Sequence, residues 1–171
     1  MRGLIVALCS GVVACAPQAS NDNGVYRNAG APMYSIAAFD ASQLEGRWDQ
    51  VAAFGPKTAV GCRPGGAEFA RNANATQLNY QLCLSGRNTT GAGTITPTGP
   101  GRFRIPGKDR IGKDWWVLWV DEGYRTIVIG NPSGTFGFIL NQGRSLPADR
   151  LAAAKEVLDF NGYNIETLVV Y

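Results

Sequence analysis

The side chains that most often carry enzyme chemistry are sparse in this chain. It contains no histidine among its 171 residues, which excludes Ser-His-Asp and Cys-His catalysis and histidine metal sites. Asp40, Glu45 and Asp49 are acidic neighbours, but no second carboxylate cluster accompanies them for acid–base work. Gly91-Ala92-Gly93 does not open a helix and therefore does not resemble a phosphate-binding loop. We predict no catalytic residue, no metal site and no cofactor.

Cys62 and Cys83 suggest a different chemistry. They lie nearly symmetrically about the turn candidate Asn72-Ala73-Asn74, so a hairpin folded there would bring the two thiols together. In an exported protein two such thiols most often form a disulfide, which contributes ~3 kcal/mol through the loop-closure entropy of the unfolded chain. The alternatives are two free thiols or a catalytic thiol, although no histidine is present to activate one.

The N-terminus has the layout of an export signal. One positive charge, Arg2, precedes a short apolar segment, Leu4 to Ala14, and Cys15 follows. The apolar segment is about half of the ~20 residues that cross a bilayer. Val12-Val13-Ala14-Cys15 resembles the lipobox of bacterial lipoproteins, in which the cysteine is acylated and becomes the mature N-terminus.

That resemblance implies a signal peptide over residues 1–14, a lipidated Cys15 and attachment to the bacterial cell envelope. Ala16, where an aspartate would matter for sorting, implies the outer membrane, facing the periplasm. The alternative is an ordinary cleaved signal with an incidental cysteine. Residues 15–41 lack periodicity and are expected to be the lipidated N-terminus and a flexible tether.

Short apolar runs separated by turn signals follow, which is typical of an all-β sandwich or barrel. The eight expected strands are Arg47–Phe54, Ala67–Asn72, Thr76–Leu84, Gly93–Thr98, Arg102–Pro106, Asp114–Asp121, Arg125–Gly130 and Thr135–Asn141. Strands in this up-and-down order can close on themselves and leave no free edge.

The period then changes to that of a helix. Leu151, Ala154, Val157 and Leu158 recur at three- and four-residue intervals, and Ile165–Tyr171 is expected to be a short final strand. We therefore predict an eight-stranded barrel with one C-terminal helix packed outside it.

Three short motifs resemble the signatures of lipocalins, specifically the bacterial outer-membrane lipocalins. Gly46-Arg47-Trp48 matches a Gly-x-Trp signature on the first strand, Asp121 to Arg125 resembles the second signature, and Phe138 to Asn141 leads into the third. The resemblance covers residues 42–171, which form the expected lipocalin domain, and it implies an eight-stranded antiparallel up-and-down barrel with a ligand cavity rather than an enzyme.

The same resemblance assigns the barrel floor to Gly46, Trp48, Tyr124 and Arg144. The family's third signature carries an arginine that packs over the tryptophan. Here the aligned residue is Gln142 and the nearest arginine is Arg144. Either Arg144 covers Trp48 or that contact is lost.

The expected topology places the stretches 55–66, 85–92, 107–113 and 131–134 around the barrel mouth. They carry a set of cations with one acid, Asp109: Lys57, Arg63, Arg87, Lys108, Arg110 and Lys113. We predict a cationic rim over an apolar well, in which an anionic headgroup lies near the rim. The alternative is a merely solvated charged edge.

The expected lining of the well combines one face of the first strand with aromatic and apolar residues of later strands. These residues are Gln50, Ala52, Phe54, Tyr80, Phe103, Trp116 and Leu118.

The resulting prediction is a lipid-anchored protein that binds a fatty acid or lysophospholipid in lipid transport or envelope maintenance. A structural or partner-binding lipoprotein with a filled barrel is the alternative. The formal net charge of +3 at pH 7 is too small to indicate a nucleic-acid partner, and no particular oligomeric state is indicated.

Overall fold

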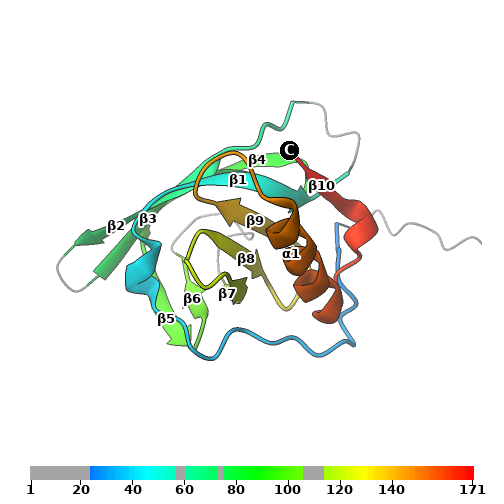
Figure 1. Ribbon diagram of the computed structural model, residues 1–171, viewed down its shortest axis with the longest axis horizontal. Helices are drawn as coiled ribbons and strands as arrows, with labels where there is room; N and C mark the ends of the chain where they lie inside the picture. Colours follow the sequence, from blue (N-terminus) through cyan, green and yellow to red (C-terminus); the bar gives the residue numbers. More distant parts are fainter. Residues whose placement is uncertain (1–23, 57–60, 73–74, 106–113) are drawn as a thin grey trace, which may run out of the picture.

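The structure is a computed structural model that describes residues 24–56, 61–72, 75–105 and 114–171. Its elements follow one another along the chain with a single α-helix near the C-terminus (Figure 1). They are η1 (Ala41–Leu44), β1 (Gly46–Phe54), β2 (Gly66–Asn72), β3 (Ala75–Leu84), β4 (Arg87–Thr94), β5 (Thr96–Gly99), β6 (Arg102–Arg104), β7 (Asp114–Val120), β8 (Thr126–Gly130), β9 (Gly137–Asn141), α1 (Ala148–Phe160), η2 (Ile165–Thr167) and β10 (Leu168–Val170).

The strands form an antiparallel barrel in which neighbours in sequence are neighbours in space. The order is β4-β3-β2-β1-β9-β8-β7-β6-β5, and β10 pairs with β1. The two ends of this order, β4 and β5, are consecutive parts of one chain joined by Ile95, whose buried side chain belongs to the interior and whose N–H donates to the Thr76 carbonyl. The predicted up-and-down topology, the outer helix and the short final strand are therefore confirmed.

One expected loop is a strand. The sequence predicts that residues 85–92 are a loop at the mouth, but β4 begins at Arg87 and pairs with β3 from Leu84↔Arg87 to Gln77↔Thr94. Its polar and glycine-rich sequence, Arg87 to Thr94, lacks the apolar alternation that marks a strand. Pairing to β3, rather than burial of its own side chains, holds it in the barrel.

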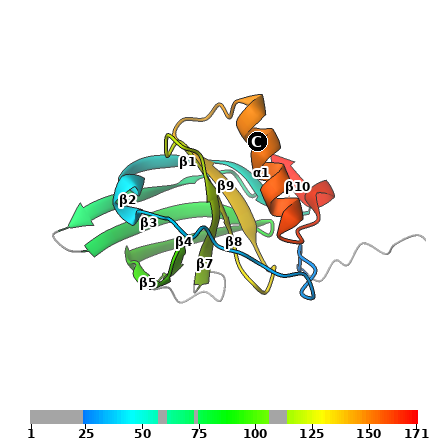
Figure 2. The ribbon, with the colours of Figure 1, turned by 60° about the horizontal axis from the view of Figure 1, so that its bottom comes forward.

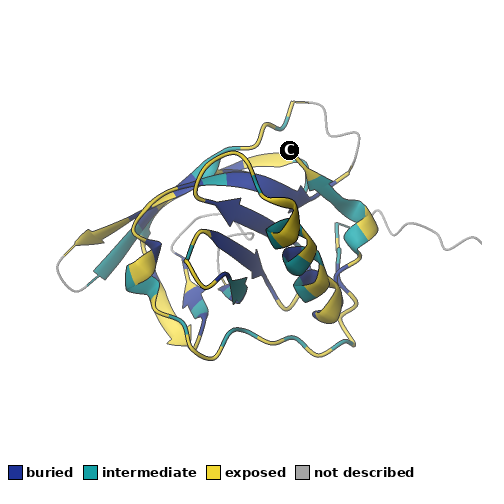
Figure 3. Cartoon of the chain, in the orientation of Figure 1, coloured by how far each residue is buried: buried dark blue, intermediate teal, exposed yellow. Residues whose placement is uncertain are grey.

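Apolar side chains divide between two cores. The inner core fills the barrel and includes Trp48, Phe69, Trp115 and Phe138. The outer core lies between the barrel and α1, which packs on β7 and β8 through residues such as Ala154 and Leu158. Because β8 and β9 contribute to both cores, every residue of each is buried (Figure 3).

Residues 24–40 form a strap along the outside of the barrel. In Figure 1 this blue segment runs along the lower edge from the end of α1 to η1, and Figure 2 shows it crossing beside β7 and β8. Its backbone donates from Ile36 N–H to the Val117 carbonyl and from Tyr26 N–H to the Gly134 carbonyl. The expectation of a flexible tether up to residue 41 is therefore wrong for residues 24–40.

Arg27 holds the first part of the strap. Its side chain is 7% exposed, and its guanidinium donates to three carbonyls, those of Asn161 at 2.7 Å, Pro132 at 3.0 Å and Ala31. The strap, the end of α1 and the β8–β9 loop therefore meet at one cation. Tyr163 reinforces this junction, since its hydroxyl accepts from the Asn131 N–H at 2.9 Å and donates to the Phe136 carbonyl at 2.9 Å. Burial raises the pKa of Tyr163 to about 12.

Replacing Arg27 with methionine is expected to lower the free energy of unfolding by ~2–4 kcal/mol, because one buried and two partly buried carbonyls lose their donor while the apolar stem is kept. Urea unfolding measures the change. Arg47→Met is the matched control, because the Arg47 side chain is 78% exposed, and it should change stability by no more than ~0.5 kcal/mol. Equal effects of the two substitutions would show that Arg27 does not hold the strap.

Candidate functional site

The barrel interior is the candidate site, and the side chains described there pack closely together. Trp48, Leu82, Trp115 and Phe138 are 0% exposed and Tyr80 is 5% exposed. Aromatic rings meet across the mouth half, with Trp115 edge-on to Phe138 at 4.9 Å between ring centroids and Tyr80 at 5.4 Å from Trp115. The open well expected from the sequence is therefore not present among the described inner side chains.

One polar atom in this interior has no partner among the described residues. The Trp115 indole Nε1 is buried and makes no hydrogen bond there. Trp48 shows the contrast, because its Nε1 donates to the Leu44 carbonyl at 2.7 Å. A buried donor left unsatisfied costs ~1–3 kcal/mol, and native proteins leave few of them. Trp115 is the second residue of β7, so this donor lies in the mouth half of the barrel.

Tyr80 occupies its place because the facing residue on β4 is glycine. Tyr80 pairs with Gly91 in the β3–β4 register. A Cβ added at Gly91 would come within 2.5 Å of Cε1, Cζ and Oη of the Tyr80 ring. The ring therefore lies directly over the Gly91 backbone and turns toward Trp115.

Two of the predicted lining residues face the interior as expected. Tyr80 and Phe103 belong to the inner core. Gln50 is 3% exposed but acts as a clip, since its amide donates to the Cys83 carbonyl and accepts from the Cys83 N–H, each at 2.8 Å. Gln50 follows Asp49, which pairs with Gly66, the first residue of β2. No residue of β2 therefore lies opposite Gln50, and its side chain joins β1 directly to β3.

Four predicted lining residues face away from the interior, and their assignment is wrong. Ala52, Phe54 and Leu118 belong to the outer core, and Trp116 packs against it with the Arg102 guanidinium 3.8 Å from its ring centroid. In β1 the register shifts between Gln50 and Ala52, which is a β-bulge. A bulge inserts one extra residue and reverses the alternation beyond it. In β7 both faces are apolar, so alternation could not show which tryptophan points inward.

The predicted rim is described only in part. Arg63 and Arg87 are exposed, as expected for a charged edge. Lys57, Lys108, Arg110 and Lys113 lie outside the described residues, and so do residues 1–14 and Cys15.

At the barrel floor, the signature residues have separate roles. Trp48 is fully buried above η1. Gly46 precedes it with φ +113°, a conformation that favours glycine. Tyr124 stacks on Phe39 with ring centroids 6.3 Å apart, and its hydroxyl accepts from the Asp40 N–H at 3.2 Å. Arg144 is exposed and lies beside Arg47 and Asp49 on the opposite face of β1 from Trp48. Of the two alternatives, the structure therefore supports the second: Arg144 does not cover Trp48.

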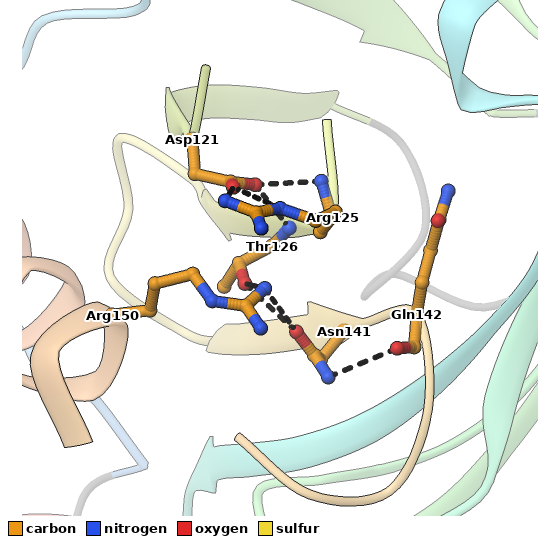
Figure 4. A network of polar contacts seen from close by, with 6 residues as sticks. All are labelled: Asp121, Arg125, Thr126, Asn141, Gln142 and Arg150. Carbon is orange, nitrogen blue, oxygen red and sulfur yellow. Dashed lines mark hydrogen bonds and ion pairs between the residues drawn. The ribbon is translucent and has the colours of Figure 1, made fainter. Parts of the chain in front are cut away.

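A different arginine joins the two later signature segments, as Figure 4 shows. Arg150 of α1 donates to Thr126 Oγ1 at 2.5 Å and to Asn141 Oδ1 at 2.9 Å. Next to it, Asp121 accepts from the N–H groups of Thr126 and Arg125, each at 2.6 Å. Although burial raises the pKa of the Asp121 carboxyl, these hydrogen bonds lower it more, so the pKa lies below its usual value. The sequence did not indicate Arg150, since it lies on the helix outside every signature motif.

The predicted disulfide is confirmed. Cys62 and Cys83 are bonded, with their Cα atoms 5.6 Å apart. The bond ties the segment before β2 to the mouth end of β3.

A groove of about 1060 Å³ lies on the outer face of β1–β4. Its charged side chains are Arg47, Asp49, Arg63, Glu68 and Arg144. Mixed charge on an open strand face does not resemble a site for an apolar molecule.

Two further searches of the described residues found no candidate. Within residues 24–56, 61–72, 75–105 and 114–171 no cluster of three or more acidic or cysteine side chains is arranged to hold a metal ion. In the same residues no helix has the length and apolar character needed to span a membrane.

Strand order, outer helix and an apolar interior together define a lipocalin-type barrel. Residues 39–171 match the model of the family described as lipocalin-like domain, and the chain belongs to this family. Its fold is one that holds small hydrophobic ligands in general, and its members are typically non-enzymatic binding proteins. No curated protein sequence matches the chain.

Solved structures with the same fold are distant in sequence. Insecticyanin from the tobacco hornworm Manduca sexta is 14% identical with a TM-score of 0.60, covering 82% of this chain and 84% of its own. The cockroach allergen Per a 4 is 11% identical with a TM-score of 0.60, covering 84% and 94%. Ex-FABP, a siderocalin with dual ligand specificities, is 13% identical with a TM-score of 0.55, covering 75% and 93%. At these identities the likeness establishes the fold alone.

Replacing Gly91 with alanine is expected to destabilise the barrel by ~1–3 kcal/mol, because the new Cβ overlaps the Tyr80 ring in a closely packed interior. Gly99→Ala is the control, since its nearest neighbour would be an Arg102 side-chain atom at 3.6 Å. Thermal unfolding compares the two. In a Tyr80→Ala background the cost of Gly91→Ala should fall, and an unchanged cost would contradict the proposed overlap.

Proposed function

We propose that this protein is a lipid-anchored lipocalin of the bacterial outer membrane that binds a single-chain amphipathic lipid inside its barrel. The ligand class is a fatty acid or lysophospholipid, with the chain in the apolar interior and a polar oxygen in the mouth half. Its role is lipid transport or envelope maintenance on the periplasmic side, without catalysis. Cys15 carries the anchor, supported by the lipobox resemblance and by the short apolar segment before it.

The unpartnered Trp115 indole N–H carries the proposal. A ligand oxygen beside Nε1 would satisfy this donor in a low-dielectric interior, where such a hydrogen bond is strongest. Carboxylate, ester and hydroxyl oxygens all qualify as acceptors, whereas a pure hydrocarbon does not. The surrounding rings of Tyr80 and Phe138 offer apolar surface to the first methylenes of the chain, each worth ~0.8 kcal/mol on burial.

Binding requires the inner side chains to separate, because those described in the mouth half are buried and their rings contact one another. Tyr80 is one side chain that would have to shift, because its ring lies over the Gly91 backbone and its centroid is 5.4 Å from that of Trp115. Rotation of its ring away from Trp115 would expose the indole edge toward the mouth.

A filled barrel that acts as a structural or partner-binding lipoprotein is the second candidate. The near-zero exposure of Trp115, Phe138 and Leu82 favours it. Mass spectrometry of lipids extracted from the purified protein separates the two candidates. A copurifying single-chain lipid, or quenching of tryptophan fluorescence by added palmitate, supports binding. An empty extract with no response to palmitate or a lysophospholipid supports the filled barrel.

Replacing Trp115 with phenylalanine is expected to weaken palmitate binding about ten- to a hundredfold, because a hydrogen bond to a charged group contributes ~1.5–3 kcal/mol. Isothermal titration calorimetry gives the dissociation constants. Trp116→Phe is the matched control, since this neighbour packs on the outer face beneath Arg102 and should leave the affinity unchanged. Equal loss in both variants would remove Trp115 from the site.

Substituting glutamine for Lys108, Arg110 and Lys113 tests the part of the cationic rim that lies outside the described residues. Exposed charge pairs contribute ~0.2–1 kcal/mol, so palmitate affinity should fall about two- to fivefold while the affinity for hexadecanol stays constant. The comparison uses the same calorimetric titration for both ligands. The rim has no headgroup role if both affinities fall equally.

A further inference from the structure

The end of the molecule where the strap begins exposes apolar side chains that its fold does not need. Phe160, the last residue of α1, is 71% exposed, and Tyr34 of the strap is 55% exposed. Their rings lie 5.9 Å apart between centroids. Val25, at the start of the strap, is 41% exposed. Tyr34 is fixed in place by its backbone N–H, which donates to Asn161 Oδ1 at 2.8 Å.

This surface, Val25, Tyr34 and Phe160, belongs to the mouth end of the barrel. Arg27 joins the carbonyl of Asn161, which follows α1, to the carbonyl of Pro132 in the β8–β9 loop. That loop joins β8 to β9 at the end opposite η1 and the Asp121–Arg125 turn. The chain therefore enters the folded part beside the mouth and reaches the floor only after running the length of the strap (Figures 1 and 2).

The length of chain before the strap limits how far this end can lie from an anchor at Cys15. Eight residues separate Cys15 from Gly24. A fully extended chain spans at most ~3.3–3.6 Å per residue, so the strap begins within about 30 Å of the acylated residue. An anchor at this position therefore keeps the mouth end close to the bilayer surface.

We propose that Val25, Tyr34 and Phe160 contact the membrane interface, so that the barrel mouth faces the bilayer that holds the Cys15 anchor. This inference rests on the lipid anchor proposed above. Aromatic side chains favour the interface between headgroups and acyl chains. The exposed Arg63 and Arg87, on loops and strand ends at the mouth, add positive charge that attracts anionic lipid headgroups. A mouth in this orientation would take up or release a single-chain lipid directly at the membrane.

The test places an environment-sensitive NBD label at one of two exposed sites in the lipidated protein. Asp159→Cys puts it beside Phe160 and leaves Val25, Tyr34 and Phe160 in place, and Glu122→Cys puts it at the floor end. The proteins are reconstituted into vesicles of phosphatidylethanolamine and phosphatidylglycerol. We expect the emission at position 159 to rise and shift to shorter wavelength, whereas that at position 122 stays as in buffer. Adding Tyr34→Ser and Phe160→Ser should abolish most of the shift at position 159.

Flotation of the same samples separates failure of the anchor from failure of the orientation. If the protein does not float with the vesicles, the lipid anchor is wrong and the inference falls with it. If it floats but position 159 does not respond, or position 122 responds more strongly, the anchor stands and the orientation is overturned. The Cys15→Ser protein without vesicles is the control for self-association. If the emission at position 159 shifts in this control, and the shift grows with protein concentration, the surface binds a second copy of the protein and membrane contact is overturned.

Discussion

The β-bulge in β1 is the constraint on which the arrangement of this barrel depends. Trp48 faces the interior and Phe54 faces the outer core, although the two are an even number of residues apart and regular pairing would place them on one face. The shift between Gln50 and Ala52 makes this possible. A single strand thereby closes the floor of the barrel and also supports the junction where Phe54 stacks between Tyr26 and Tyr163.

This division of β1 determines what the interior contains. The two largest apolar side chains of its mouth half, Val51 and Phe54, belong to the outer core, and only the small Ala53 faces inward there. In the mouth half of the interior, the space beside Ala53 is occupied by side chains of other strands, namely Trp115, Phe138 and Tyr80. The interior is therefore lined by rings that pack on one another rather than on β1. One of these rings carries an indole N–H with no acceptor among the described residues. A closely packed interior that keeps one donor unsatisfied is consistent with a site that exchanges this packing for a ligand.

Features that depend on periodicity and on turns could be predicted from the sequence. The direction of a side chain could not be predicted where both faces of a strand are apolar. The strand order and the disulfide follow from turn signals in the sequence, such as the one that predicts the pairing of β2 with β3. Trp115 and Trp116 could not be distinguished, because β7 is apolar on both faces. The bulge in β1 left no mark in the sequence, so Ala52 and Phe54 were assigned to the wrong face. Arg27 was missed because isolated polar residues in an aperiodic segment give no sign that carbonyls from distant loops surround them.

The state of the Trp115 indole N–H tests the account most directly. The indole region of a ¹H–¹⁵N NMR spectrum reports Trp115 and Trp48 separately, once each is assigned by substitution. On titration with palmitate, the Trp115 indole proton should move downfield as it gains an acceptor, while the Trp48 proton, already bonded to the Leu44 carbonyl, stays in place. A Trp115 resonance that does not move at saturating palmitate, or one that moves together with Trp48 in a general rearrangement, would contradict an interior built around this unsatisfied donor.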